Sequence, residues 1–179
     1  MKAIQFNLCF DAYFAAPLIG VGFVRDKNNF VLEDGQTQLV IKRWHGKFSN
    51  ACQCTNLSLL LRHKFLRNLE KEQVSGYPKL ISDYPVKEKI SVFRFSRFSW
   101  RYRPQNLGIR EYDEVEYGRA DDIKNILFPL VNKIKKDGLE LSRYLKPEVL
   151  YRQIKKNGEN AYCENIWLED YEFYLSNCK

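Results

Sequence analysis

Arginines and aromatic residues alternate closely in one stretch of the sequence, KISVFRFSRFSWRYRPQ, at residues 89–105. Guanidinium groups hold phosphates and exposed rings stack on bases, so the combination is typical of proteins that bind single-stranded nucleic acid. We expect the stretch to form one long β-strand. Its candidate nucleic-acid-binding residues are Arg94, Arg97, Arg101, Arg103, Trp100 and Tyr102. In the alternative interpretation, the rings fill a core and the arginines pair with acidic residues elsewhere.

Carboxylates follow this stretch directly. Glu114 and Glu116 belong to IREYDEVEY, residues 109–117, which we expect to form a returning strand. Clustered carboxylates can hold magnesium against a phosphate, as a hydrolytic nuclease requires, so both are candidate catalytic residues. Alternatively, they pair with nearby arginines while Asp121 and Asp122 cap the next helix. Because the sequence contains neither a phosphate-binding glycine loop nor a nucleophile elbow, enzymatic activity is uncertain and we favour a protein without it.

Two histidines and two cysteines have side chains that suit zinc. They are His45, Cys52, Cys54 and His63. The Cys-x-Cys spacing is tighter than the gap of two to four residues that zinc sites generally use. The sequence therefore predicts no metal site and no other cofactor, with these four residues as the alternative.

The excess positive charge of the chain lies in its middle third. Residues 41–110 carry fifteen basic and four acidic side chains, a net charge of +11. Residues 1–40 carry three basic and four acidic side chains (net −1), and residues 111–179 carry eleven and fourteen (net −3). Such a concentrated field attracts phosphate backbones or an acidic protein partner, and its other interpretation is a solubilising surface.

A helix is expected within that basic third, at residues 56–73, with an apolar stripe of leucines and a phenylalanine at a spacing of four. At 3.6 residues per turn, His63, Lys64, Arg67 and Lys71 fall together on another side of this helix. Lys64, Arg67 and Lys71 therefore join the candidate nucleic-acid-binding residues. The predicted contact surface consists of this basic helix face and the strand at residues 89–103.

The elements that would position these residues indicate an α+β fold. Alternating apolar residues predict a strand at residues 2–10, and further strands are expected at 20–25, 30–33 and 37–44, with Asp34-Gly35 as a turn. Helices are expected at 121–138, where Pro129 marks a kink or a restart, and at 147–157. Residues 160–177 are compatible with either a helix or an edge strand. We predict a single domain, residues 1–179, in which an antiparallel sheet is built mainly from the N-terminal half with one embedded helix, and a helical C-terminal half packs on one face.

Cysteine use and hydropathy point to a cytoplasmic protein. The five cysteines have no disulfide-framework spacing, no secretory signal opens the chain, and no run approaches the roughly 20 apolar residues that cross a bilayer. We therefore predict a cytoplasmic protein that does not enter the membrane and binds nucleic acid, either RNA or single-stranded DNA. The alternatives are an interaction or inhibitor module that docks on an acidic or nucleic-acid-binding partner, and a metal-dependent nuclease. The sequence does not determine the oligomeric state.

Overall fold

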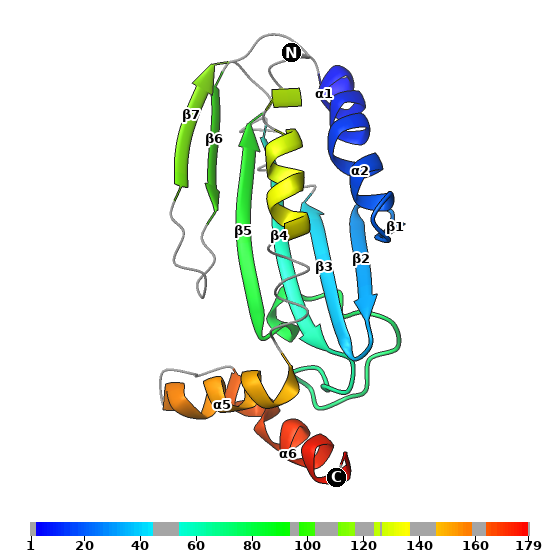
Figure 1. Cartoon of the computed structure of the whole chain (residues 1–179), viewed down its shortest axis with the longest axis vertical. Helices are drawn as coiled ribbons and strands as arrows, with labels where there is room; N and C mark the ends of the chain where they lie inside the picture. Colours follow the sequence, from blue (N-terminus) through cyan, green and yellow to red (C-terminus); the bar gives the residue numbers. More distant parts are fainter. Residues whose placement is uncertain are drawn as a thin grey trace.

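A computed structural model gives the structure of the chain. It describes residues 3–44, 54–93, 97–102, 111–116, 124–125, 127–136, 146–158 and 164–178. The fold is α+β, as the sequence predicts: a helical segment at the N-terminus precedes the strands, and further helices follow them. The main sheet has five antiparallel strands in sequential order, and two further strands form a separate ladder (Figure 1). The main-sheet strands are β1 (Val24–Asp26), β2 (Asn29–Asp34), β3 (Thr37–Trp44), β4 (Cys54–His63) and β5 (Val86–Phe93).

The hairpins at the start of the sheet confirm the sequence prediction. Register pairs Asp34 of β2 with Thr37 of β3, so the chain reverses through Gly35 and Gln36. Gly35 has a φ of +55°, a left-handed value that glycine adopts without a steric penalty. The Asp-Gly dipeptide therefore fixes the register in which Phe30 and Ile41 face each other.

The N-terminal strand predicted at residues 2–10 is wrong, because this segment is helical. Helix α1 (Ala3–Phe10) runs through a π-helical turn at Asp11–Ala15, called the π-turn below, into α2 (Ala16–Ile19). Phe10, Phe14 and Leu18 are all completely buried against the sheet. Their spacing of four residues extends beyond the short alternating pattern of residues 4–10, and this longer apolar face determines the structure.

The helix predicted at residues 56–73 is also wrong, because its first half is the central strand β4. Leu57, Leu59 and Leu61 face the main core, whereas Leu60 packs on the other face with Val40 and Tyr84. A strand that is buried on both faces shows a continuous apolar run instead of alternation. The same leucines therefore fit a helical spacing, and only the pairing of β4 with β3 and β5 distinguishes the two.

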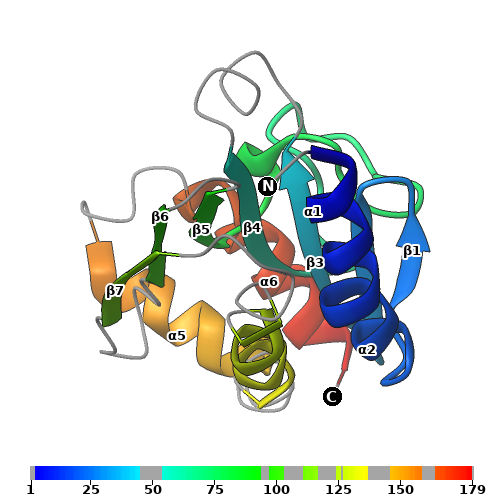
Figure 2. The same cartoon turned by 90° about the horizontal axis from the view of Figure 1, so that it is seen from above.

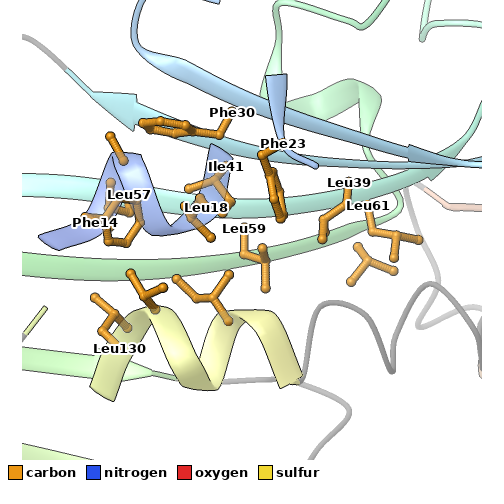
Figure 3. Packing of buried hydrophobic residues seen from close by; sticks show 14 of the residues in the cluster. Phe14, Leu18, Phe23, Phe30, Leu39, Ile41, Leu57, Leu59, Leu61 and Leu130 are labelled. Carbon is orange, nitrogen blue, oxygen red and sulfur yellow. The ribbon is translucent and has the colours of Figure 1, made fainter. Parts of the chain in front are cut away.

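Two helical layers cover one face of the main sheet. α1 and α2 lie over β2 and β3, and the helix at residues 127–136 lies over β4 and β5 (Figure 2). Phe14 and Leu18 of the N-terminal helices and Leu130 of the helix at residues 127–136 pack against the same face of the sheet, in a common core (Figure 3). Residues 124–125 and 127–136 are helical, as expected within 121–138, and Pro129 lies within this helical segment. The connector between β4 and β5, residues 64–85, covers the opposite face.

The C-terminal helices lie at one end of the sheet (Figure 1). α5 (Pro147–Asn157) has the predicted bounds and ends at Gly158, whose φ is +53°. A 3-10 turn (Glu164–Trp167) and α6 (Leu168–Asn177) show that the segment with two possible interpretations is helical. In the part of the chain that the structure describes, none of the helices combines the length and apolar character that a membrane span needs.

Candidate nucleic-acid interface

The arginine and aromatic stretch is divided between two sheets, so the single long strand predicted at residues 89–105 is wrong. Its first part is the end of β5, which pairs with β4. Its second part is β6 (Arg97–Tyr102), which pairs with β7 (Glu111–Glu116) in the two-stranded ladder beside β5 (Figure 1). Arg97, Trp100, Arg101 and Tyr102 stand on β6, whereas Arg94 and Arg103 lie outside the described residues.

The candidate carboxylates stand on β7, in the returning strand that the sequence predicts. Register places Glu116 directly opposite Arg97, and Glu114 opposite Ser99. Directly opposite residues in an antiparallel ladder project to the same face, and opposite charges there stabilise the pair. Arg97 therefore has a carboxylate as its cross-strand neighbour, whereas Arg101 stands opposite Tyr112. Asp121 and Asp122 lie outside the described residues.

Lys64, Arg67 and Lys71 do not form a basic helix face, because the connector after β4 is not a helix. The ammonium group of Lys64 contacts the Glu33 carboxylate at 2.5 Å, and that ion pair lowers the pKa of Glu33. Lys71 stands 3.9 Å from Glu169 and has a left-handed φ of 63°. Acidic residues from β2 and α6 therefore offset the charges that the predicted helix would have presented to a ligand.

Arg67 fastens the connector to α6. Its backbone N–H donates to Asp170 at 2.8 Å, and its side-chain Nε donates to the same carboxylate at 2.6 Å. The hydrogen bond with Asp170 raises the pKa of the Arg67 guanidinium. The indole N–H of Trp167 donates to the Arg67 carbonyl at 2.8 Å. Arg67 therefore has a structural role in joining the connector to α6.

His63 and Arg62, the last two residues of β4, are buried beside this junction. Nδ1 of His63 is hydrogen-bonded to the Tyr171 hydroxyl at 2.8 Å, and the His63 ring stacks on Phe65. Arg62 donates to the carbonyls of His63 and Leu66, and burial lowers the pKa of its guanidinium. Both side chains thus hold the connector and α6 against the end of β4.

The zinc alternative gains no support from His63, which is held by Tyr171. The structure does not test the other three candidates, because His45 and Cys52 lie outside the described residues and Cys54 is described only as part of strand β4. Within the described ranges, no three histidine, cysteine or acidic side chains are grouped as metal ligands would be. A site formed by His45, Cys52 and Cys54 stays an untested alternative.

An open groove of about 840 Å³ lies between the connector and α6. Three aromatic side chains and five polar or charged ones contribute to its lining, which consists of Phe65, Arg67, Gln73, Glu169, Asp170, Phe173, Tyr174, Asn177 and Cys178. The rings of Phe65 and Tyr174 stack with their centres 4.0 Å apart. Because Arg67 and Asp170 already bind each other, the groove offers apolar surface and few polar groups that are free to orient a ligand.

Comparisons with known proteins add no relative. The chain matches no protein-family model, no curated protein and no solved structure. Candidate residues are therefore chosen from their chemistry and their surroundings in this structure.

Five basic residues that the sequence prediction did not include stand on or beside the C-terminal helical segments. Lys135 and Lys136 stand on the helix at residues 127–136, and Lys146, Arg152 and Lys156 stand at or on α5. Four of these five side chains are exposed, Lys135 is half-buried, and none forms an ion pair with another described residue. A charge count over a shorter window would have found them: residues 124–158 carry nine basic and three acidic side chains, a net charge of +6. The acidic residues on either side conceal that excess in the count for residues 111–179.

Proposed function

We propose that the protein binds single-stranded nucleic acid, RNA or DNA, along the flank opposite α1 and α2. The contact residues are those of β6 together with the basic side chains of the helix at residues 127–136 and of α5. Strand β6 lies beyond β5, and the helix lies over β4 and β5, so both are on the same flank of the sheet (Figures 1 and 2).

The observation that carries this proposal is the division of the basic side chains into two groups. Lys64 and Arg67 are held by acidic residues of the same chain. Lys136, Arg152 and Lys156 are exposed and have no ion-pair partner among the residues described. Lysines and arginines that no carboxylate holds can neutralise phosphates and release the cations condensed on the nucleic acid, which contributes a large part of the binding affinity.

Strand β6 contributes the chemistry that distinguishes single strands from duplexes. Trp100 and Tyr102 alternate along it with Arg97 and Arg101. Unpaired bases have free faces that rings and guanidinium planes can stack on, with about 1–3 kcal/mol for each base. Bases in a duplex are already stacked on each other, so we expect a preference for single strands.

The register of the ladder favours binding over cleavage. A magnesium-dependent nuclease needs its carboxylates directed at the metal and the phosphate. Register instead places Glu116 directly opposite Arg97, a cross-strand position in which opposite charges attract each other. An interaction or inhibitor module on an acidic partner remains the second candidate, because the same exposed lysines and arginines would serve it.

The test is the binding of fluorescent single-stranded RNA and DNA, measured by anisotropy at several salt concentrations. Raising the salt from about 50 to 200 mM should weaken binding by roughly 100-fold if about five phosphates are contacted. Replacement of Trp100 and Arg101 by alanine should weaken it by about 10- to 100-fold. The matched control is Lys64→Ala, which removes one positive charge that Glu33 already offsets and should change the affinity less than about twofold.

Three outcomes would reject parts of this proposal. Absent or salt-independent binding to both nucleic acids would reject it entirely, and an acidic protein partner in stoichiometric amount would then favour the interaction module. An equal effect of Lys64→Ala and Arg101→Ala would remove β6 from the interface. Magnesium-dependent cleavage that Glu116→Gln abolishes would show that the protein is an enzyme.

A further inference from the structure

The outer side of α1, the π-turn and α2 carries large apolar side chains in contact with solvent. Ile4, Leu8 and Ile19 are 74%, 65% and 47% exposed. Between residues 3 and 20 the sequence has one charged residue, Asp11, and its carboxylate pairs with Arg25 at 3.1 Å. Apart from Asn7, which is also exposed, and Asp11, which is paired with Arg25, the exposed side chains described on this segment are apolar.

The π-turn keeps the exposed side straight. In an α-helix each step of four residues drifts by roughly 40°, so a series of five such positions would wind around the helix. The π-turn closes wider i to i+5 hydrogen bonds, which reverses part of this drift. Its place at Asp11–Ala15 leaves Phe10, Phe14 and Leu18 on the core side, while Leu8, Ala12 and Ala16 are exposed opposite them.

We propose that this outer side is the contact between two copies of the chain, with the two helical segments antiparallel about a twofold axis at Ala12. At a spacing of four, the exposed residues are Ile4, Leu8, Ala12, Ala16 and Gly20. This order of side-chain sizes is complementary to its own reverse. In this arrangement Ile4 of one copy faces Gly20 of the other, and Leu8 faces Ala16. Both large side chains of this series, Ile4 and Leu8, therefore meet small residues, which allows two helices to approach closely and interdigitate.

The chemistry of the surface favours a second copy over other occupants. A helix that lies on a membrane surface carries lysine or arginine along its polar face, and residues 3–20 contain neither. A charged protein partner would find no complementary charge here. A twofold contact requires a surface that is complementary to itself, and the order of large and small side chains meets this requirement.

The expected dimer is weak. The helical residues from Ala3 to Ile19 extend over roughly 25 Å. A helix pair of that length buries on the order of 1,000 Å² in total, at the lower end of specific interfaces. We therefore expect a dissociation constant in the range of tens of micromolar, which dilution readily reveals.

Sedimentation velocity of the full chain between about 5 and 500 μM tests the contact, since the expected dissociation constant lies within that range. The wild type should change from monomer to dimer over this range. Leu8→Glu should raise the dissociation constant by about 100-fold, because a carboxylate would be desolvated opposite Ala16. The matched control is Leu80→Glu, which charges a leucine of similar exposure, 62%, on the connector, and should leave the constant unchanged. Thermal unfolding of both variants verifies that they fold.

A crosslink locates the axis. Ala12→Cys brings two thiols together across the twofold axis, and copper phenanthroline with oxygen removes two electrons and two protons to form one disulfide. Mass spectrometry should find chains joined at position 12, whereas Leu80→Cys should give no joined species at position 80. A wild type that stays monomeric at every concentration, or equal effects of Leu8→Glu and Leu80→Glu, would overturn the proposal. Leu8-dependent sedimentation with phosphatidylcholine vesicles by a monomeric chain would replace the second copy with a membrane.

Discussion

Asp170 joins two parts of the chain that are more than 100 residues apart. Its carboxylate accepts hydrogen bonds from the backbone N–H and from the side chain of Arg67, and only 8% of the residue is exposed. Loss of one partner leaves the other polar group buried without a hydrogen bond. The free-energy penalty for that group exceeds the net stabilisation that the hydrogen bond itself contributes. The position of the connector against α6 thus depends strongly on this one side chain.

Replacement of Asp170 by alanine should lower the free energy of unfolding by about 2–3 kcal/mol, because at least one buried donor of Arg67 would be left unsatisfied. Urea denaturation measures it. The neighbouring Glu169 also contacts Arg67, at 3.3 Å, but is 70% exposed, so Glu169→Ala should change stability by less than about 0.5 kcal/mol. Equal losses in the two variants would contradict the structural role of Asp170.

The sequence could not identify the partners of Arg67. Its chemistry marked it correctly as a residue that binds anions, but the anion is a carboxylate of the same chain. Nothing in the local sequence indicates a contact with a residue more than 100 positions away, and the wrong helix assignment placed Arg67 on a solvent-facing side. By contrast, the candidate pair of Arg97 and Glu116 was predictable, because adjacent strands joined by a short connection generally pair.

The sequence predicted an element correctly where its turn residues and its hydrophobic periodicity both indicated the same structure. β2 and β3 follow from β-branched residues around an Asp-Gly turn, and α5 follows from a proline at its start and a glycine at its end. β4 was missed because a strand buried on both faces and a helix share the same leucine spacing. The π-turn was missed because it adds one residue to a turn without any marker in the composition.

The π-turn should be essential for the packing of the N-terminal helices. Deletion of Ala12 should convert it into an α-helical turn and rotate the preceding residues by roughly 100° relative to α2. Phe10 would then leave its contacts with Phe14 and Phe30, at a cost of about 3 kcal/mol or more. Urea denaturation and the far-ultraviolet circular dichroism signal together should show a destabilised protein that keeps its helix content.

The control for this deletion keeps the length of the chain. Ala12→Ser changes an exposed side chain without moving the helical phase, so we expect stability within about 0.5 kcal/mol of the wild type. If the deletion is as stable as Ala12→Ser, the wider turn has no role in aligning Phe10 with the core.

Charge is divided across the molecule as a whole. Glu169 and Asp170 of α6 face the connector and pair with its cations, whereas Lys136, Arg152 and Lys156 on the helix at residues 127–136 and on α5 are exposed to solvent. The α+β class was predictable because strand and helix patterns occupy different halves of the sequence. The location of the exposed charge was not, since it depends on which cations the fold pairs internally.

Charge reversal tests whether the exposed surface contacts phosphates. The variant replaces Lys135, Lys136, Arg152 and Lys156 with glutamate, and it should bind single-stranded nucleic acid more weakly. The slope of log K against log salt should become shallower by about 0.7 for each phosphate that the variant no longer binds. The slope is obtained from anisotropy titrations at several salt concentrations.

A control on the other flank uses two reversals, which change the net charge by −4, half of the −8 in the four-residue variant. Lys27 and Lys79 lie away from the ladder, beside β1 and on the connector. Glutamate at both positions should reduce affinity modestly through the overall field and leave the slope almost unchanged. A similar decrease of the slope in both variants would show that net charge, and no particular surface, determines binding.

The sequential order of the main sheet has a consequence for synthesis on the ribosome. Each strand from β1 to β5 pairs with the one made just before it, so the sheet can assemble as the nascent chain emerges. The partners of His63 and Arg67 on α6 are translated more than 100 residues later. During that interval the end of β4 and the connector lack their final hydrogen bonds, so a stalled or truncated chain would expose this junction to proteases.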